Sequence, residues 1–134
     1  MKNQSLEVKA AIQISKTAGE VYEAIVDPSK MSNYLISEGS GRMEDGKTVK
    51  NKYISFFWDS DGIELSVEMT LTPKANNSTL VSITEKGRDN DEAGIKWLRG
   101  NTEGWANFLG CLKAWLEYGI NLRKGAFDYM SENK

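Results

Sequence analysis

The last third of the chain carries the sequence feature that most constrains the fold. From Gly104 to Arg123, large apolar side chains recur at intervals of three or four residues, and polar side chains lie between them. The apolar stripe consists of Trp105, Phe108, Leu109, Leu112, Trp115, Leu116, Gly119 and Leu122. This pattern predicts a long amphipathic helix. Its face is so bulky that the rest of the chain must supply a large apolar surface against it.

Length and charge exclude several function classes. The chain has 134 residues, enough for an apolar core, and we expect one domain spanning residues 1–134. A net charge of −2 leaves no basic excess for nucleic acid or an anionic membrane. No run approaches the roughly 20 apolar residues of a membrane span, and the first residues lack the apolar core of a signal peptide. We therefore expect a cytoplasmic protein that binds neither nucleic acid nor membranes.

The chain contains no histidine and a single cysteine, Cys111. The absence of histidine excludes histidine-based catalytic groups and metal sites, and Cys111 is interpreted as an apolar packing residue. Glu64 and Glu68 alternate with apolar residues, so we expect them to face water and not to form a catalytic pair. The acidic run 89–92 lacks the twelfth ligand of a calcium loop. We predict no catalytic residue, no metal and no cofactor.

Apolar alternation predicts an antiparallel sheet upstream of the helix. A strand is expected over residues 6–14, followed by a helix that Thr17 and Glu20 open as a capping box and that Asp27 ends. A second short helix is predicted over Met31 to Leu35. A short strand and turn follow over 41–47, then strands over 49–58, 63–72 and 79–85. Turns are expected at 59–62 and 73–78, a break at 87–91, and a helical turn at 92–98.

The length of the loop at 59–62 decides which side chains face inward. An even number of loop residues would place on one inner face Ile54, Phe56, Trp58, Leu65, Val67 and Met69. An odd number would instead bring in Tyr53, Ser55 and Phe57. We favour the even number because it buries three large apolar groups. It leaves Tyr53 and Phe57 on the outer face, as a candidate patch for a homodimer or another protein partner.

Three stretches together resemble a known superfamily. They are Ile14 to Pro28 (ISKTAGEVYEAIVDP), Leu71 to Gly87 (LTPKANNSTLVSITEKG), and Gly104-Trp105 followed by Leu109, Leu112, Leu116 and Gly119. In this order they look like the START-like (SRPBCC) superfamily, and they are most similar to the branch that contains homologues of the heat-shock-protein-90 ATPase activator. The resemblance covers nearly the whole chain.

The resemblance implies an α+β helix-grip fold. In that fold a curved antiparallel β-sheet wraps around a long C-terminal α-helix, and two short helices follow the first strand. It also implies a cavity between the sheet and the helix for a small apolar or amphipathic molecule. The superfamily includes lipid and hormone carriers, cyclases and chaperone activators, so the resemblance implies no single function.

Strand parity and helix spacing nominate the residues that would line such a cavity. They are Ile54, Phe56, Trp58, Leu65, Val67, Met69, Ile83, Glu85, Trp105, Phe108, Leu112, Trp115, Gly119 and Arg123. Two further aromatic side chains, Trp97 and Tyr53, are weaker candidates for the lining. Ligand pockets are mostly apolar with a few placed polar groups, but the same aromatic side chains could simply fill a core.

Three of these residues have alternative interpretations. Glu85 shares the parity of Ile83, so its carboxylate could project inward and orient a ligand or titrate high; we favour a solvated position at the rim. Arg123 would lie in the last helical turn, where we favour extension to solvent over ligand recognition. Gly119 would lie on the buried stripe, where close approach of a strand is favoured over room for a ligand.

The leading hypothesis is a non-enzymatic domain that binds a small apolar or amphipathic molecule. The second is an interaction module that acts on a chaperone or a similar protein, with Tyr53 and Phe57 as its contact patch. The third is a cyclase or hydrolase. We rank it last because only Glu85 and Arg123 could supply acid–base groups to the interior.

Overall fold

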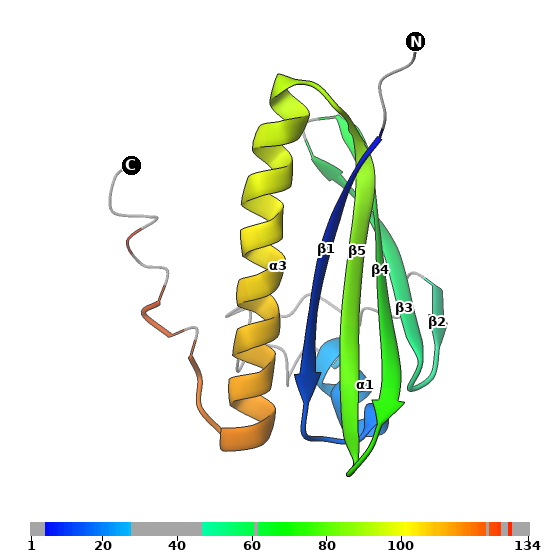
Figure 1. Ribbon diagram of the computed structural model, residues 1–134, viewed down its shortest axis with the longest axis vertical. Helices are drawn as coiled ribbons and strands as arrows, with labels where there is room; N and C mark the ends of the chain where they lie inside the picture. Colours follow the sequence, from blue (N-terminus) through cyan, green and yellow to red (C-terminus); the bar gives the residue numbers. More distant parts are fainter. Residues whose placement is uncertain (1–4, 28–46, 61, 123, 127–128, 130–134) are drawn as a thin grey trace.

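The structure of the protein is a computed structural model that describes residues 5–27, 47–60, 62–122, 124–126 and 129. The predicted helix at Met31 to Leu35 lies outside these residues, as does nearly all of the predicted strand and turn at 41–47. The elements follow the order β1 (Ser5–Ile14), α1 (Ala18–Val26), β2 (Lys47–Val49), β3 (Tyr53–Ser60), β4 (Ile63–Lys74), β5 (Ser78–Asp89) and α3 (Glu92–Tyr118) (Figure 1).

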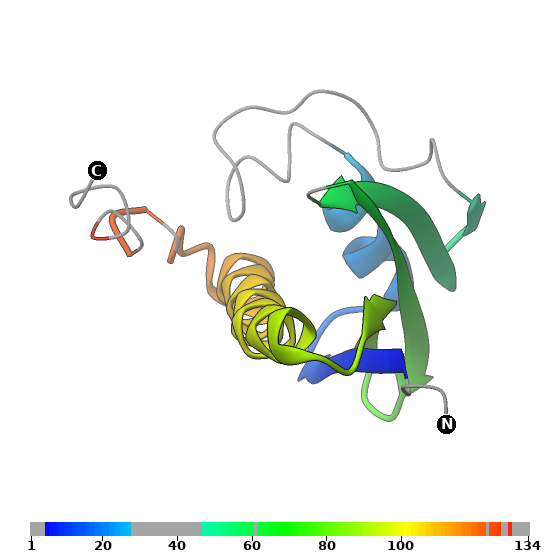
Figure 2. The ribbon, with the colours of Figure 1, turned by 90° about the horizontal axis from the view of Figure 1, so that it is seen from above.

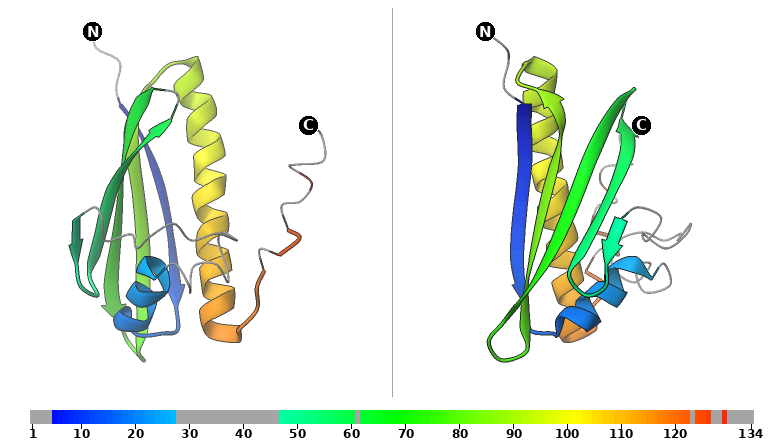
Figure 3. Two further views of the ribbon diagram at one scale, coloured as in Figure 1. Left: turned by 180° about the vertical axis from the view of Figure 1, so that it is seen from behind. Right: turned by 90° about the vertical axis from the view of Figure 1, so that its right-hand side faces the viewer.

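The strands form one antiparallel sheet in the order β1-β5-β4-β3-β2. The helix α3 runs along the sheet and packs mainly on β1 and less on β5, while α1 covers one end (Figures 1 and 3). Seen from above, the sheet curves away from α3 towards β3 and β2 (Figure 2). This is the α+β helix-grip arrangement, and the predicted fold class is confirmed. No helix among the described residues combines the length and apolar character that a membrane crossing needs.

The hairpin between β3 and β4 has the pairing register expected for a loop with an even number of residues. Ile54 pairs with Met69, Phe56 with Val67, and the backbone of Trp58 with that of Leu65. The strands reach Ser60 and restart at Ile63, so two residues close the loop, and Gly62 supplies a φ of +80°. The predicted inner face is confirmed, and the turn is shorter than expected.

The prediction of one strand over residues 49–58 is wrong, because a tight turn divides it into β2 and β3. Asn51 adopts a φ of +64°, and the Lys52 N–H donates to the Val49 carbonyl at 2.9 Å. Asparagine tolerates this left-handed conformation better than most residues. Since Asn51 stands between two lysines in a β-rich stretch, the apolar pattern did not reveal the turn.

Both β4 and β5 are longer than predicted. Pro73 lies within β4 and pairs with Thr79, so the predicted turn at 73–78 shrinks to residues 75–77, where Asn76 and Asn77 have positive φ. The predicted break in the sheet at 87–91 begins later than expected. The strand continues to Asp89 through a bulge at Gly87, whose φ is +137° and where a Cβ would lie 2.6 Å from the Glu64 carbonyl oxygen.

The predicted capping box opens α1. The Thr17 hydroxyl accepts from the Glu20 N–H at 3.3 Å, and the Glu20 carboxylate accepts from the Thr17 N–H at 3.2 Å. The Thr17 hydroxyl also donates to Glu20 Oε1 at 3.0 Å. The hydrogen bonds that the Thr17 N–H and the Thr17 hydroxyl donate to the Glu20 carboxylate lower the pKa of Glu20 below its ordinary value. The helix ends at Val26, with Asp27 as its C-cap, as the sequence predicts.

The helix α3 is one continuous element that begins and ends earlier than predicted. The helical turn expected at 92–98 is its first part, capped by the Asp91 carboxylate, which accepts from the Gly94 N–H at 2.7 Å. The prediction that the helix continues to Arg123 is wrong. It ends at Tyr118, and Gly119 closes it at a φ of +67°. Leu122, expected on the buried stripe, is 52% exposed.

Two apolar clusters fill the space between the sheet and the helices. The large cluster joins α1, the sheet and the C-terminal half of α3; its members are Ile14, Val21, Tyr22, Ala24, Ile25, Val26, Ile54, Val67, Met69, Leu71, Val81, Ile83, Phe108, Leu109, Cys111 and Leu112. The small cluster lies under the first turns of α3 and consists of Val8, Leu65 and Trp97. Trp105 packs against both clusters. Cys111 is buried, as predicted.

Candidate functional site

Half of the predicted lining residues come together on the inner face as a buried apolar floor. The floor consists of Ile54, Leu65, Val67, Met69, Ile83, Phe108 and Leu112, each at most 3% exposed. Strand pairing explains how they meet, because partners across a sheet share a face. Ile54, Met69 and Ile83 form one row across β3, β4 and β5. Phe108 and Leu112 face them from α3, four residues apart on one side of the helix.

Three predicted aromatic side chains stand half-buried at the edge of this floor. Phe56 comes from β3, and Trp105 and Trp115 come from α3; all three pack against the large cluster. The rings of Trp105 and Phe108 meet edge to face, with centroids 5.5 Å apart and an interplanar angle of 86°. We call Phe56, Trp105 and Trp115 the aromatic rim. The rim stays partly exposed because α3 sits over the β1 side of the sheet (Figure 2).

Glu85 is the buried charged residue of the inner face. It lies between Val67 and Val8 in the row that starts at Phe56, and its exposed fraction is 0%. Its Oε1 accepts hydrogen bonds from Asn101 Nδ2 at 2.7 Å and from Trp105 Nε1 at 3.1 Å. The favoured interpretation of Glu85 as a solvated rim residue is therefore wrong. The two donors from α3 offset the cost of burying the carboxylate and join β5 to the helix.

Asn101 is the residue of this site that the sequence analysis missed. It lies four residues before Trp105 and four after Trp97, so the three side chains share one face of α3. That spacing was the available signal, but the apolar stripe was taken to begin at Trp105. Trp97 is 8% exposed, and its Nε1 has no hydrogen-bond partner among the described residues. Arg88 Nε is also buried and has no hydrogen-bond partner among the described residues.

Of the remaining predicted lining residues, Gly119 lies away from the site, and Arg123 and the Trp58 side chain fall outside the described residues. Gly119 is exposed at the end of α3, and a Cβ there would meet nothing within 4 Å, so its predicted packing role is wrong. It ends the helix instead. Arg123 lies outside the described residues, beyond the end of α3. The backbone of Trp58 pairs opposite Leu65 as predicted, and its side chain lies outside the described part of the chain.

The outer face of the sheet carries a separate apolar patch at β2 and β3. We call Val49, Tyr53 and Phe57 the outer patch; Phe57 is 66% and Val49 is 48% exposed. The Tyr53 hydroxyl donates to Glu68 Oε2 at 2.6 Å, and this hydrogen bond raises the pKa of Tyr53 above its ordinary value. Glu64 and Glu68 lie on this outer face, as predicted.

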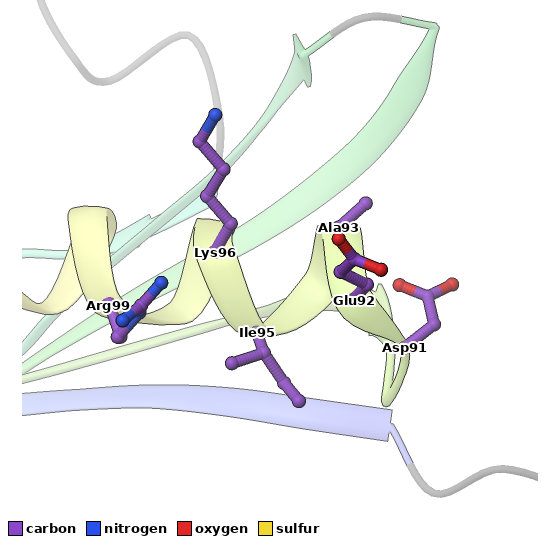
Figure 4. A pocket seen from close by; sticks show the side chains of 6 residues that line it. All are labelled: Asp91, Glu92, Ala93, Ile95, Lys96 and Arg99. Carbon is purple, nitrogen blue, oxygen red and sulfur yellow. The ribbon is translucent and has the colours of Figure 1, made fainter.

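A surface depression lies beside the first turns of α3. Its lining residues are Asp91, Glu92, Ala93, Ile95, Lys96 and Arg99. Figure 4 shows that their side chains spread around the helix in different directions and do not converge on one point. Two acidic residues, Asp91 and Glu92, are followed along the helix by two basic ones, Lys96 and Arg99. In the described ranges no three His, Cys, Asp or Glu side chains gather in a way that could hold a metal ion. The inner face therefore remains the candidate site.

The sheet and α3 define a helix-grip fold, and solved structures share this fold. The protein SSP2350 from Staphylococcus saprophyticus is 28% identical, with a TM-score of 0.74 over 88% of this chain and 96% of that one. Aha1 from Colwellia psychrerythraea, solved as a dimer, is 20% identical, with a TM-score of 0.67 over 85% and 98%. An AHSA1-like protein from Rhizobium etli is 21% identical, with a TM-score of 0.62 over 84% and 82%.

No family model and no curated protein matches the chain. The structural likenesses confirm the fold that the resemblance implied, and Aha1-like proteins, the branch that the sequence resembles, are among the structures that share it. What these structures share with the chain is the arrangement of the sheet and α3. Function has to be argued from the side chains of the site.

Proposed function

We propose that this protein binds a small apolar or amphipathic molecule between the inner face of the sheet and α3, without catalysing a reaction. The observation that carries the proposal is the aromatic rim. Phe56, Trp105 and Trp115 are large apolar side chains that stay half-buried beside a fully buried apolar floor. Covering such side chains with an apolar molecule removes them from water, which favours binding by roughly 25 cal/mol per Å².

Adjacent phenylalanines on β3 provide a matched test. Phe56 belongs to the aromatic rim, and its neighbour Phe57 points to the outer face, 66% exposed. Purified wild type, Phe56→Ser and Phe57→Ser would be titrated with the fluorescent probe 1-anilinonaphthalene-8-sulfonate. Native mass spectrometry of the wild type would reveal any copurified molecule.

We expect Phe56→Ser to weaken probe binding about tenfold, because part of the roughly 1.5–3 kcal/mol of a phenylalanine's apolar contact is lost. Phe57→Ser should bind the probe as wild type does. Thermal unfolding checks that each variant is folded, and Phe56→Leu replaces Phe56→Ser if the latter does not fold. A wild type that binds no probe, or equal binding by both serine variants, would count against the proposal.

A second candidate function is interaction with a chaperone or another protein through the outer patch. Its support is the exposure of Phe57 and Val49 on the face opposite the candidate ligand site. The structural likeness to Aha1 suggests this class of partner only by analogy. Exposed aromatic side chains are enriched at protein interfaces.

The variant Phe57→Ser also tests this second function. If the outer patch is an interface, Phe57→Ser should abolish capture of partner proteins from a lysate, whereas Phe56→Ser should retain it. The interface hypothesis fails if the two variants and wild type capture the same proteins.

A further inference from the structure

Two buried N–H groups under the first turns of α3 have no hydrogen-bond partner among the described residues. They are the indole Nε1 of Trp97 and the Nε of Arg88. Trp97 as a whole is 8% exposed. Nearly all buried polar groups in folded proteins are hydrogen-bonded, so such a pair calls for an explanation. What both groups lack is an acceptor.

Strand pairing places these donors beside Glu85. Val8, which belongs to the small cluster with Trp97, pairs directly with Glu85 across β1 and β5. Leu6 packs against the same cluster and pairs with Arg88, so the Arg88 side chain shares the inner face. The unpaired donors and the buried carboxylate therefore lie at the same end of the interior.

The inner face of α3 shows which donor remains available. Trp97, Asn101 and Trp105 follow one another at intervals of four residues on one side of the helix. Asn101 Nδ2 and Trp105 Nε1 both donate to Glu85. Trp97 Nε1, the third donor of this column, does not have such a bond.

The charges at this end favour an uncharged acceptor. The carboxylate of Glu85 is already buried at this end, on the strand face that the register also gives to Arg88. Around them the walls are apolar, formed by Val8, Leu65 and the ring of Trp97. A second carboxylate placed there would meet Glu85 in an apolar surrounding, where like charges repel strongly.

We propose that this end of the interior is a head-group site that recognises a neutral oxygen, a hydroxyl or a carbonyl, through the Trp97 indole N–H. The inference rests on the proposed function and names the class of ligand, an uncharged apolar molecule that carries one oxygen. Trp105 packs against both clusters and so connects the head-group site with the aromatic rim. Because Glu85 and Trp97 Nε1 are closed to solvent here, the first turns of α3 shift when the oxygen enters.

Three aromatic probes of similar size distinguish the head groups. They are 2-naphthol, 2-methylnaphthalene and 2-naphthoate, and each would compete with 1-anilinonaphthalene-8-sulfonate at pH 7. We expect 2-naphthol to bind wild type about 3- to 10-fold more tightly than 2-methylnaphthalene, the ratio that one net hydrogen bond supplies. The anion 2-naphthoate should bind more weakly than either.

The variant Trp97→Phe keeps an aromatic ring and removes the N–H donor. In this variant the advantage of 2-naphthol over 2-methylnaphthalene should disappear, while 2-methylnaphthalene binds as before. The control Trp115→Phe removes an indole N–H from the aromatic rim and should keep the advantage. If Trp97→Phe does not fold, the comparison of head groups in wild type still decides the matter.

The outcomes separate the two proposals. Equal affinity of wild type for 2-naphthol and 2-methylnaphthalene, or tighter binding of 2-naphthoate, would overturn the head-group site and leave the proposed function standing. An unchanged advantage of 2-naphthol in Trp97→Phe would also overturn it. If wild type binds 1-anilinonaphthalene-8-sulfonate but none of the three probes displaces it, the head-group site fails; if wild type does not bind 1-anilinonaphthalene-8-sulfonate at all, both proposals fail.

Discussion

The two halves of α3 contact the sheet in different ways. The C-terminal half, Gly104–Tyr118, buries Phe108, Leu109 and Leu112 in the large cluster. The N-terminal half, Glu92–Glu103, rests on the small cluster. Beneath this half and its boundary at Trp105 lie a buried carboxylate and two N–H groups that find no acceptor in the described part of the chain. The C-terminal half of α3 thus packs on apolar side chains, whereas the space beneath the N-terminal half also contains polar groups.

The C-terminal half has a further attachment to β1. Lys113 Nζ donates to the Gln13 carbonyl at 2.7 Å and to the Glu117 carboxylate, and the Ser15 N–H donates to Glu117 Oε2 at 2.8 Å. Stability is not uniform within folded proteins, and the parts that bind ligands tend to be the less stable ones. The C-terminal half therefore supplies most of the support for the fold, and we expect the N-terminal half to be the part that opens.

The largest difference between the halves should come from truncating one leucine in each. Leu112 is fully buried in the large cluster, and we expect Leu112→Ala to lower the free energy of unfolding by about 2–5 kcal/mol. Leu98 is half-buried at the small cluster, so Leu98→Ala should cost clearly less. Urea unfolding followed by tryptophan fluorescence measures both. Equal losses would contradict the unequal roles of the two halves.

The start of α3 should not tolerate a side chain at Gly94, where the helix backbone lies close to the end of β5. A Cβ at Gly94 would lie 2.0 Å from the Asp89 carbonyl oxygen and 3.0 Å from Leu6 Cδ1. We expect Gly94→Ala to destabilise the protein by about 1–3 kcal/mol, the usual cost of overpacking. Thermal unfolding by circular dichroism provides the measurement. A wild-type midpoint would show that the contact between α3 and β5 can yield.

The attachment of the C-terminal half to β1 should depend on pH. The hydrogen bonds from Lys113 and Ser15 lower the pKa of Glu117 below its ordinary 4.5. A carboxylate with a lowered pKa in the folded state stabilises the protein above the unfolded value and loses this effect as the pH falls through the folded value. Glu117→Gln should therefore cost about 1 kcal/mol at pH 7, and this difference should vanish in acid.

Glu103 provides the control for this prediction, because it is exposed on the same helix. Glu103→Gln should leave the free energy of unfolding at wild-type level at pH 7. Urea unfolding at a series of pH values compares the two variants. A cost of Glu117→Gln that stays constant down to strongly acidic pH would refute the role of the ionised carboxylate.

The smallest expected effect is a gain in stability in the N-terminal half. Gly100 lies in α3, is exposed, and would place a Cβ with nothing within 4 Å. Gly100→Ala should stabilise the protein by about 0.8–1 kcal/mol, because alanine has the higher helix propensity. If this half must shift to admit a head group, Gly100→Ala should also slow amide exchange there. A loss of stability would mean that the glycine has a structural role.

Local pattern was enough to predict the parts of the fold that depend on neighbouring residues. Alternation identified the inner face of β3 and β4, including the even loop that pairs Phe56 with Val67. The Thr17–Glu20 capping box is a contact between residues three positions apart, so its side chains could be read directly. The ends of strands and helices were predicted less well, because Asn51, Pro73 and Gly87 act through backbone conformations that depend on the partner strand.

The sequence by itself determined the amphipathic stripe of α3 and the strand face that Glu85 shares with Ile83, since both follow from the periodicity of side chains along strands and helices. The helix-grip arrangement was implied by the resemblance to a known superfamily. Only the tertiary structure decided that Glu85 is fully buried, because its donors, Asn101 and Trp105, come from a helix 16 and 20 residues away. It also decided that Gly119 ends α3 and that the Trp97 N–H meets no acceptor within the ranges that the structure describes. Burial and hydrogen bonding depend on which surfaces come together in the fold, and the periodicity of side chains within one segment cannot predict that.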